Sequence, residues 1–174
     1  LGGNSLLDIL IFGRRAGNHA LEYARQTEFQ LMPNNPLEAA EAYLNRLMDG
    51  DSKEQIADIR RDMGNLMADK AGIFRTADRL SQALEELQKL KERYQRLKVT
   101  DKSKTFNTEL VTALELGNML DLAPSIVQGA LVRAECRGAH HREDFPKRDD
   151  ENWLKHTMAT KGNDGQPILH FEPV

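Results

Sequence analysis

The feature that most constrains the fold is a set of three consecutive segments between residues 56 and 134 with apolar residues at three- and four-residue spacing. This spacing places apolar side chains on one face of an α-helix. The apolar positions are Ile56, Ile59, Met63, Leu66 and Met67; then Leu80, Leu84, Leu87, Leu90, Tyr94 and Leu97; then Leu110, Leu114, Met119, Leu122, Ile126, Ala130 and Ala134. Three such helices with short connections predict a mainly α protein built as an antiparallel three-helix bundle.

Capping residues and prolines indicate where these helices begin and bend. Thr76 or Arg75 is expected to begin the second helix. Asn107 is expected to cap the third, because its side chain can accept a hydrogen bond from a free amide of the first turn. Pro124 is expected to kink the third helix. Earlier in the chain, the pattern predicts a helix over residues 5–25 and a short one over residues 36–48, with a proline-rich loop between them.

The pattern changes after Gly138, where the chain becomes charged and rich in turns. Residues 154–159 and 168–171 are expected to form short strands, joined across residues 162–165, whose glycines are typical of a hairpin turn. We therefore predict a helical domain over residues 36–139. It is followed by an irregular segment and a β-hairpin over residues 140–174, cut short at the C-terminus.

The first residues form a helix start that could face a ligand. Gly2 and Gly3 allow the backbone to approach a ligand closely, and Asn4 or Ser5 could cap the helix. The amides and positive end of such a helix suit an anion or an electron-rich carbonyl. Residues 6–12 are apolar nearly all round, as in a helix enclosed by a larger protein. Because the chain starts with Leu1, we expect it to be a piece of a longer polypeptide.

Composition excludes several functional classes. The net charge of −3 provides no large field to attract nucleic acid or an anionic membrane. The apolar run over residues 6–12 is too short to span a bilayer, and a single cysteine excludes an internal disulfide. We expect a soluble chain without a nucleic-acid partner.

One cluster raises the question of a metal site. Cys136 and His140 are four residues apart and His141 follows, but no third and fourth ligand stand at the spacing of a zinc site, so no metal is predicted. The neighbouring charges are expected to form salt bridges rather than to act as acid–base catalysts. They are Asp144, Asp149, Asp150 and Glu151 with Arg137, Arg142, Lys147 and Arg148, while Phe145 and Trp153 are expected to anchor the segment.

Two blocks of sequence carry a family resemblance. Residues 1–13, LGGNSLLDILIFG, resemble the last flavin-contacting segment of the succinate dehydrogenase and fumarate reductase flavoprotein subunits. The runs RAECRGAH (133–140), REDFP (142–146) and RDDENWLKHT (148–157) resemble the same subunits near their C-terminus. The blocks occur in the family's order, and the succinate dehydrogenase branch is favoured.

The resemblance implies the cofactor and the residues that contact it. In the family, the backbone at the positions of Ser5 and Leu6 lies against the pyrimidine end of FAD, and Asn4 and Gly3 are implied as supports. Residues 1–35 would then end an FAD-binding domain, and the helical domain would be the spectrin-repeat-like C-terminal domain of the family. No catalytic residue is implied in this chain, since the family's catalytic residues all lie upstream, so the isolated chain is expected to lack FAD and activity.

The resemblance also implies a reaction and its partners. The parent would oxidise succinate to fumarate with hydride transfer to FAD. Its electrons would then pass through an iron–sulfur subunit to quinone, in a complex held by membrane anchor subunits at the cytoplasmic face of the inner membrane. Fumarate reduction is the reverse activity of its sibling enzymes.

Two alternatives remain open at this stage. L-aspartate oxidase shares the Asn-Ser-Leu-Leu helix start and a related helical tail, but its version of the block around residues 138–153 is shorter. The chain could also be a helical interaction module without flavin chemistry. A glycine-rich dinucleotide-binding fingerprint several hundred residues upstream would favour a flavoenzyme over such a module.

Overall fold

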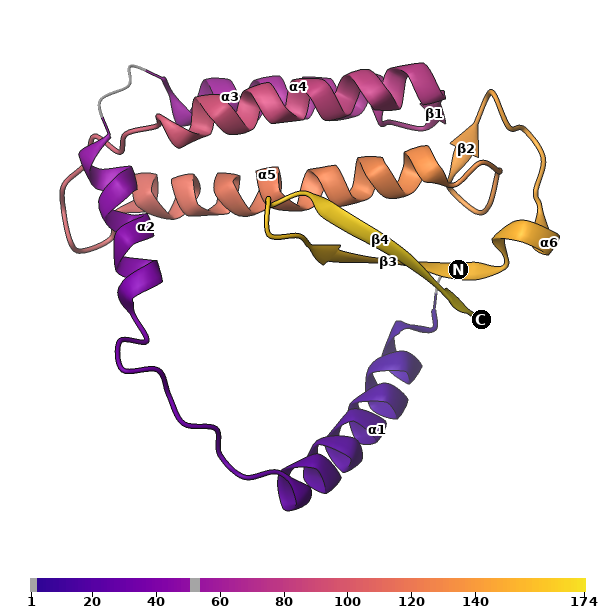
Figure 1. The fold of residues 1–174 in the computed structure, drawn as a ribbon, viewed down its shortest axis with the longest axis horizontal. Coiled ribbons are helices and arrows are strands. Elements are labelled where there is room, and N and C mark those ends of the chain that lie inside the picture. Colours follow the sequence, from indigo (N-terminus) through magenta and orange to yellow (C-terminus); the bar gives the residue numbers. More distant parts are fainter. Residues whose placement is uncertain (1–2, 51–53) are drawn as a thin grey trace. The chain divides into compact units, whose positions relative to one another are not determined.

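Helices dominate the computed structural model, which describes residues 3–50 and 54–174 (Figure 1). The elements are α1 (Ser5–Gln26), α2 (Glu38–Asp49), α3 (Ile56–Lys70), β1 (Phe74–Arg75), α4 (Ala77–Gln95), α5 (Thr108–Val132), β2 (His141–Arg142), α6 (Asp150–Trp153), β3 (Lys155–Lys161) and β4 (Pro167–Pro173). The chain divides into two units, residues 1–39 and 40–174. All the predicted helices and both predicted strands are present.

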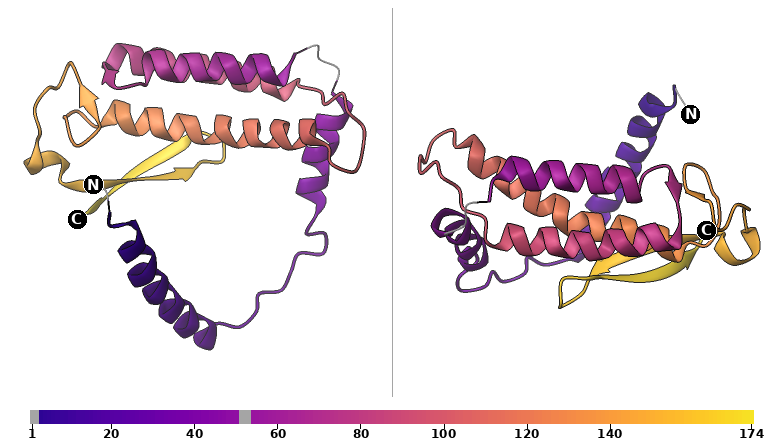
Figure 2. Two further views of the ribbon diagram at one scale, coloured as in Figure 1. Left: turned by 180° about the vertical axis from the view of Figure 1, so that it is seen from behind. Right: turned by 90° about the horizontal axis from the view of Figure 1, so that it is seen from above.

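The second unit is built on the bundle of α3, α4 and α5, in which α4 runs antiparallel to the other two (Figures 1 and 2). The stripes predicted for the first two helices face its core. Ile59, Leu80 and Leu87 are at most 2% exposed. The other buried members of these stripes are Met63, Leu66, Leu90, Tyr94 and Leu97. The antiparallel three-helix bundle is therefore confirmed.

The predicted stripe of the third helix was correct only in part. Ala130 is buried, and Leu110, Leu114 and Met119 pack against the core. Leu122 and Ile126 are 64% and 57% exposed, whereas Leu116 and Leu120 are at most 1% exposed. The buried face also contains Ala113, Ala123, Val127 and Ala130. Apolar residues surround α5 almost completely, so their spacing does not define one face. Among the described residues α5 is also the helix whose length and composition would suit a membrane span, and one of its faces forms part of the bundle core.

The predicted cap Asn107 is present, and Thr76, one of the two residues predicted to begin the second helix, caps α4. The Thr76 hydroxyl accepts a hydrogen bond from the Arg79 amide at 3.3 Å, and the Asn107 side chain accepts one from the Leu110 amide at 2.8 Å. Each bond satisfies a first-turn amide that has no partner within the helix. α5 continues as one helix through Pro124.

Polar and backbone contacts connect α2 to one end of the bundle. The Tyr43 and Tyr94 hydroxyls are 2.6 Å apart, and Tyr94 donates to the Ala113 carbonyl at 2.9 Å. Tyr43 must therefore donate to Tyr94. A Cβ at Gly117 would lie 2.3 Å from the Tyr43 hydroxyl, so α5 needs a glycine there. The buried side chain of Leu47 belongs to the same core.

The predicted hairpin lies along α5 (Figures 1 and 2). β3 and β4 pair antiparallel, with Thr157 opposite Phe171. In the turn, the Gly165 amide donates to the Gly162 carbonyl at 2.9 Å, and Gly165 has a φ of +76°, which a residue without a Cβ adopts freely. The hairpin register leaves Met158 and Ile168 exposed on its outer face.

A second pairing was not predicted. β1 and β2 pair in parallel, with Phe74 opposite His141 and Arg75 opposite Arg142. The pairing joins the α3–α4 connection to the segment after α5. Two residues are too few to show the alternation that identifies a strand in a sequence.

Candidate functional site

The predicted ligand-facing residues stand at the start of α1. Gly3 has a φ of +91°, in the left-handed region that favours glycine. Asn4 occupies the N-cap position, but its side chain makes no capping hydrogen bond, so side-chain capping by Asn4 is not observed. The Asp8 amide closes the first helical turn on the Asn4 carbonyl at 2.9 Å. The amides of Ser5 and Leu6 belong to the turn that has no acceptor within the helix, and these donors could hold an electron-rich ligand atom.

Helix α1 buries none of its residues. Leu6, Leu10 and Phe12 are 73%, 71% and 57% exposed, and Leu7, Ile9 and Ile11 are exposed as well. A continuous apolar surface of this kind is rare on a monomer and typical of an interface. The helix therefore has the surface expected of an element that a larger protein encloses.

The segment after α5 is organised by a buried arginine. Arg142 is 1% exposed, and one guanidinium nitrogen donates to the Ala130 and Leu131 carbonyls at 2.9 and 2.8 Å. These carbonyls belong to the last turn of α5, which has no amide partners within the helix. Arg142 also forms a bidentate pair with Asp144 at 2.8 Å, and this hydrogen-bonded arginine lowers the Asp144 pKa to about 2. Both residues belong to the group of charged residues predicted to form salt bridges.

A buried carboxylate, which the sequence analysis did not predict, lies beside this cap. Glu135 is 0% exposed and accepts hydrogen bonds from Arg133 and Arg137, both at 2.7 Å, and from the Asp149 amide at 2.9 Å. Burial acts to raise the Glu135 pKa, but these hydrogen bonds and the arginine charges outweigh it and lower the pKa to about 2. Glu135 therefore joins the end of α5 to the chain fourteen residues further on.

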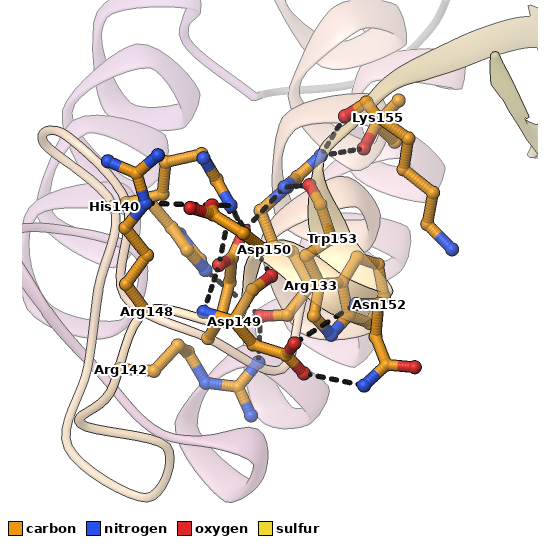
Figure 3. Close-up of polar contacts among 12 residues, drawn as sticks. Arg133, His140, Arg142, Arg148, Asp149, Asp150, Asn152, Trp153 and Lys155 are labelled. Carbon is orange, nitrogen blue, oxygen red and sulfur yellow. Dashed lines mark hydrogen bonds and ion pairs between the residues drawn. The ribbon is translucent and has the colours of Figure 1, made fainter. Parts of the chain in front are cut away.

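Figure 3 shows how this cluster fixes the entry into the hairpin. Arg133 donates to the carbonyls of Trp153 and Lys155 at 2.9 and 2.7 Å, and its guanidinium lies 5.3 Å from the Trp153 ring centre. Asp149, predicted as an ion-pair partner, instead caps α6 by accepting from the Asn152 amide at 3.0 Å. Asp150 pairs with Arg137 and Arg148, as the sequence predicted. Trp153 also packs edge-on against Phe171, as an anchor would.

Both ring nitrogens of His140 form hydrogen bonds, one with an arginine side chain and one with a backbone carbonyl. One ring nitrogen, Nδ1, lies 2.9 Å from the Arg75 guanidinium, and the other, Nε2, lies 3.0 Å from the Arg133 carbonyl. An arginine can only donate, so Nδ1 accepts and Nε2 carries the proton. Burial, together with the charges of Arg75, Arg142 and Arg133, lowers the His140 pKa. Cys136 lies 3.6 Å from His141, and no group of three metal-binding side chains occurs within residues 3–50 and 54–174.

The His140 contacts predict a pH effect on stability. Protonation of His140 would abolish the acceptor for Arg75 and add a charge beside three arginines, so the folded state prefers the neutral ring. Because the pKa is lower in the folded chain than its usual value of about 6.5, stability should fall as the pH drops below about 6.5. In urea titrations at pH 7 and pH 5, H140Q should remove this loss, whereas H19Q, on the exposed helix α1, should retain it. An identical loss in both variants would contradict the assignment.

Comparison with known proteins agrees with this architecture. The family model described as fumarate reductase flavoprotein C-term matches residues 60–174. The chain is 43% identical to the fumarate reductase flavoprotein subunit of Mycobacterium tuberculosis over 100% of its length and 31% of the relative's. It is 46% identical to the succinate dehydrogenase flavoprotein subunit of Coxiella burnetii, covering 91% of this chain and 27% of that one.

Solved structures give the same result. A variant of E. coli quinol fumarate reductase FrdA superimposes with a TM-score of 0.89 at 38% identity, over 100% of this chain and 30% of that one. Mycobacterium smegmatis Sdh1 gives 0.88 at 30% identity, over 99% and 29%. The second unit is thus a helical C-terminal domain of the flavoprotein type. The chain belongs to the succinate dehydrogenase and fumarate reductase flavoprotein family, and it spans about 30% of the length of these relatives.

Proposed function

We propose that the chain is the C-terminal part of the flavoprotein subunit of a succinate dehydrogenase. The longer protein would oxidise succinate to fumarate with hydride transfer to FAD. The observation that carries this proposal is the match of the entire chain to flavoprotein subunits, from the glycine-led helix to the hairpin. Fumarate reduction is the same reaction in reverse, and relatives of both kinds occur at similar identity.

The start of α1 would contact the pyrimidine end of FAD. When bound, FAD supplies the hydride acceptor. The amides of Ser5 and Leu6 would donate to it, and the positive helix end would stabilise the negative charge that reduction places there. Gly3 has a positive φ and no side chain, so a flavin could approach the backbone at the start of α1. The Asn4 side chain does not cap the helix, so the first-turn amides are left as donors for the flavin. These residues fit one edge of a flavin, and no residue of this chain is assigned a catalytic role.

The remaining parts of the chain would then have distinct tasks. Residues 1–35 would complete the FAD-binding domain, residues 36–139 would form the helical domain, and residues 140–174 would be held on it by the Arg133–Glu135–Arg142 cluster. The electrons would leave through an iron–sulfur subunit toward quinone, in a complex anchored at the cytoplasmic face of the inner membrane. This assignment follows the relatives, whose structures include quinol fumarate reductase and an Sdh1 complex.

A comparison of the full-length protein with these 174 residues tests the proposal. The full-length flavoprotein should bind FAD and reduce an artificial dye in a succinate-dependent manner. The isolated chain should do neither, because one helix end cannot enclose a cofactor as a preformed pocket does. A flavin-loaded preparation of the isolated chain, or a full-length protein without succinate activity, would refute the proposal. Faster fumarate reduction than succinate oxidation would place it in the sibling branch.

A pair of variants of the full-length protein tests the backbone contact. G3V should reduce the flavin-to-protein ratio severalfold, since a β-branched residue does not adopt a φ of +91° without strain and its side chain would approach the flavin. S5A should retain the flavin, because the proposed contact uses the Ser5 amide and not its hydroxyl. Loss of flavin in S5A alone would contradict a backbone contact.

A further inference from the structure

Phe106 is a bulky apolar residue at the tip of the connection between α4 and α5. Its side chain is 94% exposed, and its φ is +52°, the one positive value for a non-glycine residue in the described chain. A bulky residue in the left-handed region strains the backbone. The Phe106 side chain does not contribute to the core, because it is exposed. Its backbone conformation does not require phenylalanine either, because glycine would adopt the same positive φ without strain and would expose no apolar ring.

The connection that presents Phe106 is held rigidly by polar contacts. The Glu109 carboxylate accepts from the Thr100 and Asp101 amides at 3.0 and 2.7 Å. The Asn107 side chain donates to the Asp101 and Ser103 carbonyls at 2.8 and 3.1 Å, while its oxygen caps α5. These bonds fix the residues on both sides of Phe106 and hold the ring away from the bundle. A connection that is already ordered loses little backbone entropy when a partner covers its aromatic side chain.

The surroundings of Phe106 indicate what kind of surface it fits. A groove of about 430 Å³ lies between the first turns of α3 and α5, and on the α5 side its lining begins at Thr108, two residues after Phe106. Ile56, Arg60 and Thr112 also line it. The connection itself carries Lys98, Lys102 and Lys104 against one acid, Asp101. An exposed aromatic ring on a connection with an excess of basic residues is complementary to an apolar hollow bordered by acidic residues.

We propose that Phe106 is an anchor that docks the helical domain onto the part of the flavoprotein polypeptide that this chain does not include. The proposal rests on the proposed function, in which this chain forms the C-terminal part of a longer flavoprotein. The occupant is assigned to the same polypeptide because this chain accounts for 31% of the length of its relatives, so most of the protein's own surface lies outside it. A contact within one polypeptide is also permanent. It would keep the Phe106 ring buried in the full-length protein, and this burial would offset the backbone strain.

Fluorine NMR of the full-length flavoprotein tests the proposal directly. With 4-fluorophenylalanine at position 106, the isolated 174-residue chain should show a solvent isotope shift between H₂O and D₂O. The full-length flavoprotein without its iron–sulfur partner should show that shift reduced at least severalfold. A probe that remains exposed in the flavoprotein overturns the proposal, and so does one that is shielded only after the iron–sulfur subunit is added. Succinate-dependent dye reduction on the same sample reports the proposed function separately.

Substitutions at position 106 distinguish a docking role of Phe106 from a role in the stability of the bundle itself. In the isolated chain, F106G should raise the urea midpoint of unfolding, because glycine relieves the positive φ. In the full-length protein the same variant should increase the rate of proteolytic release of the helical domain at least severalfold. I73A, which removes an apolar side chain 71% exposed in the turn between α3 and α4, is the matched control and should leave that rate unchanged. A lower midpoint for F106G in the isolated chain, or an equal effect of I73A, would overturn the proposal.

Discussion

Replacement of Glu135 by alanine is expected to lower the free energy of unfolding of the second unit by about 3–5 kcal/mol. The carboxylate is fully buried and accepts from Arg133, Arg137 and the Asp149 amide. Its removal takes one hydrogen-bond acceptor from each of two arginines and from one amide, at a position where the carboxylate itself is fully buried. The loss should appear as a lower urea midpoint in the 174-residue chain.

Glu151 is the matched control, because it is an exposed glutamate of the same segment. E151Q should change the free energy of unfolding by no more than about 0.5 kcal/mol. The Glu135 pKa of about 2 lies below its usual value, so the stabilisation is complete above about pH 4.5 and is lost as the pH falls toward 2. An equal midpoint for the two variants at pH 7 would show that the cluster does not stabilise the fold.

Replacement of Leu87 by alanine is expected to cost about 2–5 kcal/mol. Leu87 is 2% exposed at the centre of the apolar face of α4, where it belongs to the core shared by α3 and α5. The alanine would leave a cavity that the antiparallel helices cannot close completely. Chemical denaturation monitored by circular dichroism gives the measurement.

Lys89 is the control for this second result. It lies two residues further along α4 on the exposed side, so K89A should change the free energy of unfolding by no more than about 0.5 kcal/mol. Similar effects of L87A and K89A would contradict the observation that Leu87 lies on the buried face of α4 and Lys89 on the exposed face.

Several elements of the fold were readable in the sequence because their causes are local. Thr76 and Asn107 cap the helices that follow them through residues three positions away, so their spacing is sufficient to identify them. The stripes of α3 and α4 alternate with charged residues, so one face is defined. α5 lacks that contrast, so Leu122 and Ile126 were wrongly assigned to its buried face, and Leu116 and Leu120 were missed.

The polar cluster after α5 could be identified only in part. Arg142 and Asp144 are close in sequence, and both were predicted to form salt bridges, although their mutual pairing was not specified. The α5 carbonyls that Arg142 caps lie nine to twelve residues earlier, and the buried state of Glu135 depends on a segment that folds back from residue 149. No local pattern distinguishes a buried glutamate beside two arginines from a solvated one.

The sequence by itself determined the helices, the hairpin turn and the family, since each depends on residues close together or on a motif of fixed order. Only the tertiary structure decided which face of α5 is buried, which arginine caps it, and that β1 and β2 pair. It also decided that Phe106 is exposed in a left-handed conformation. These features depend on contacts between distant parts of the chain, because burial and hydrogen-bond partners are set by packing and not by the spacing of residues along one helix.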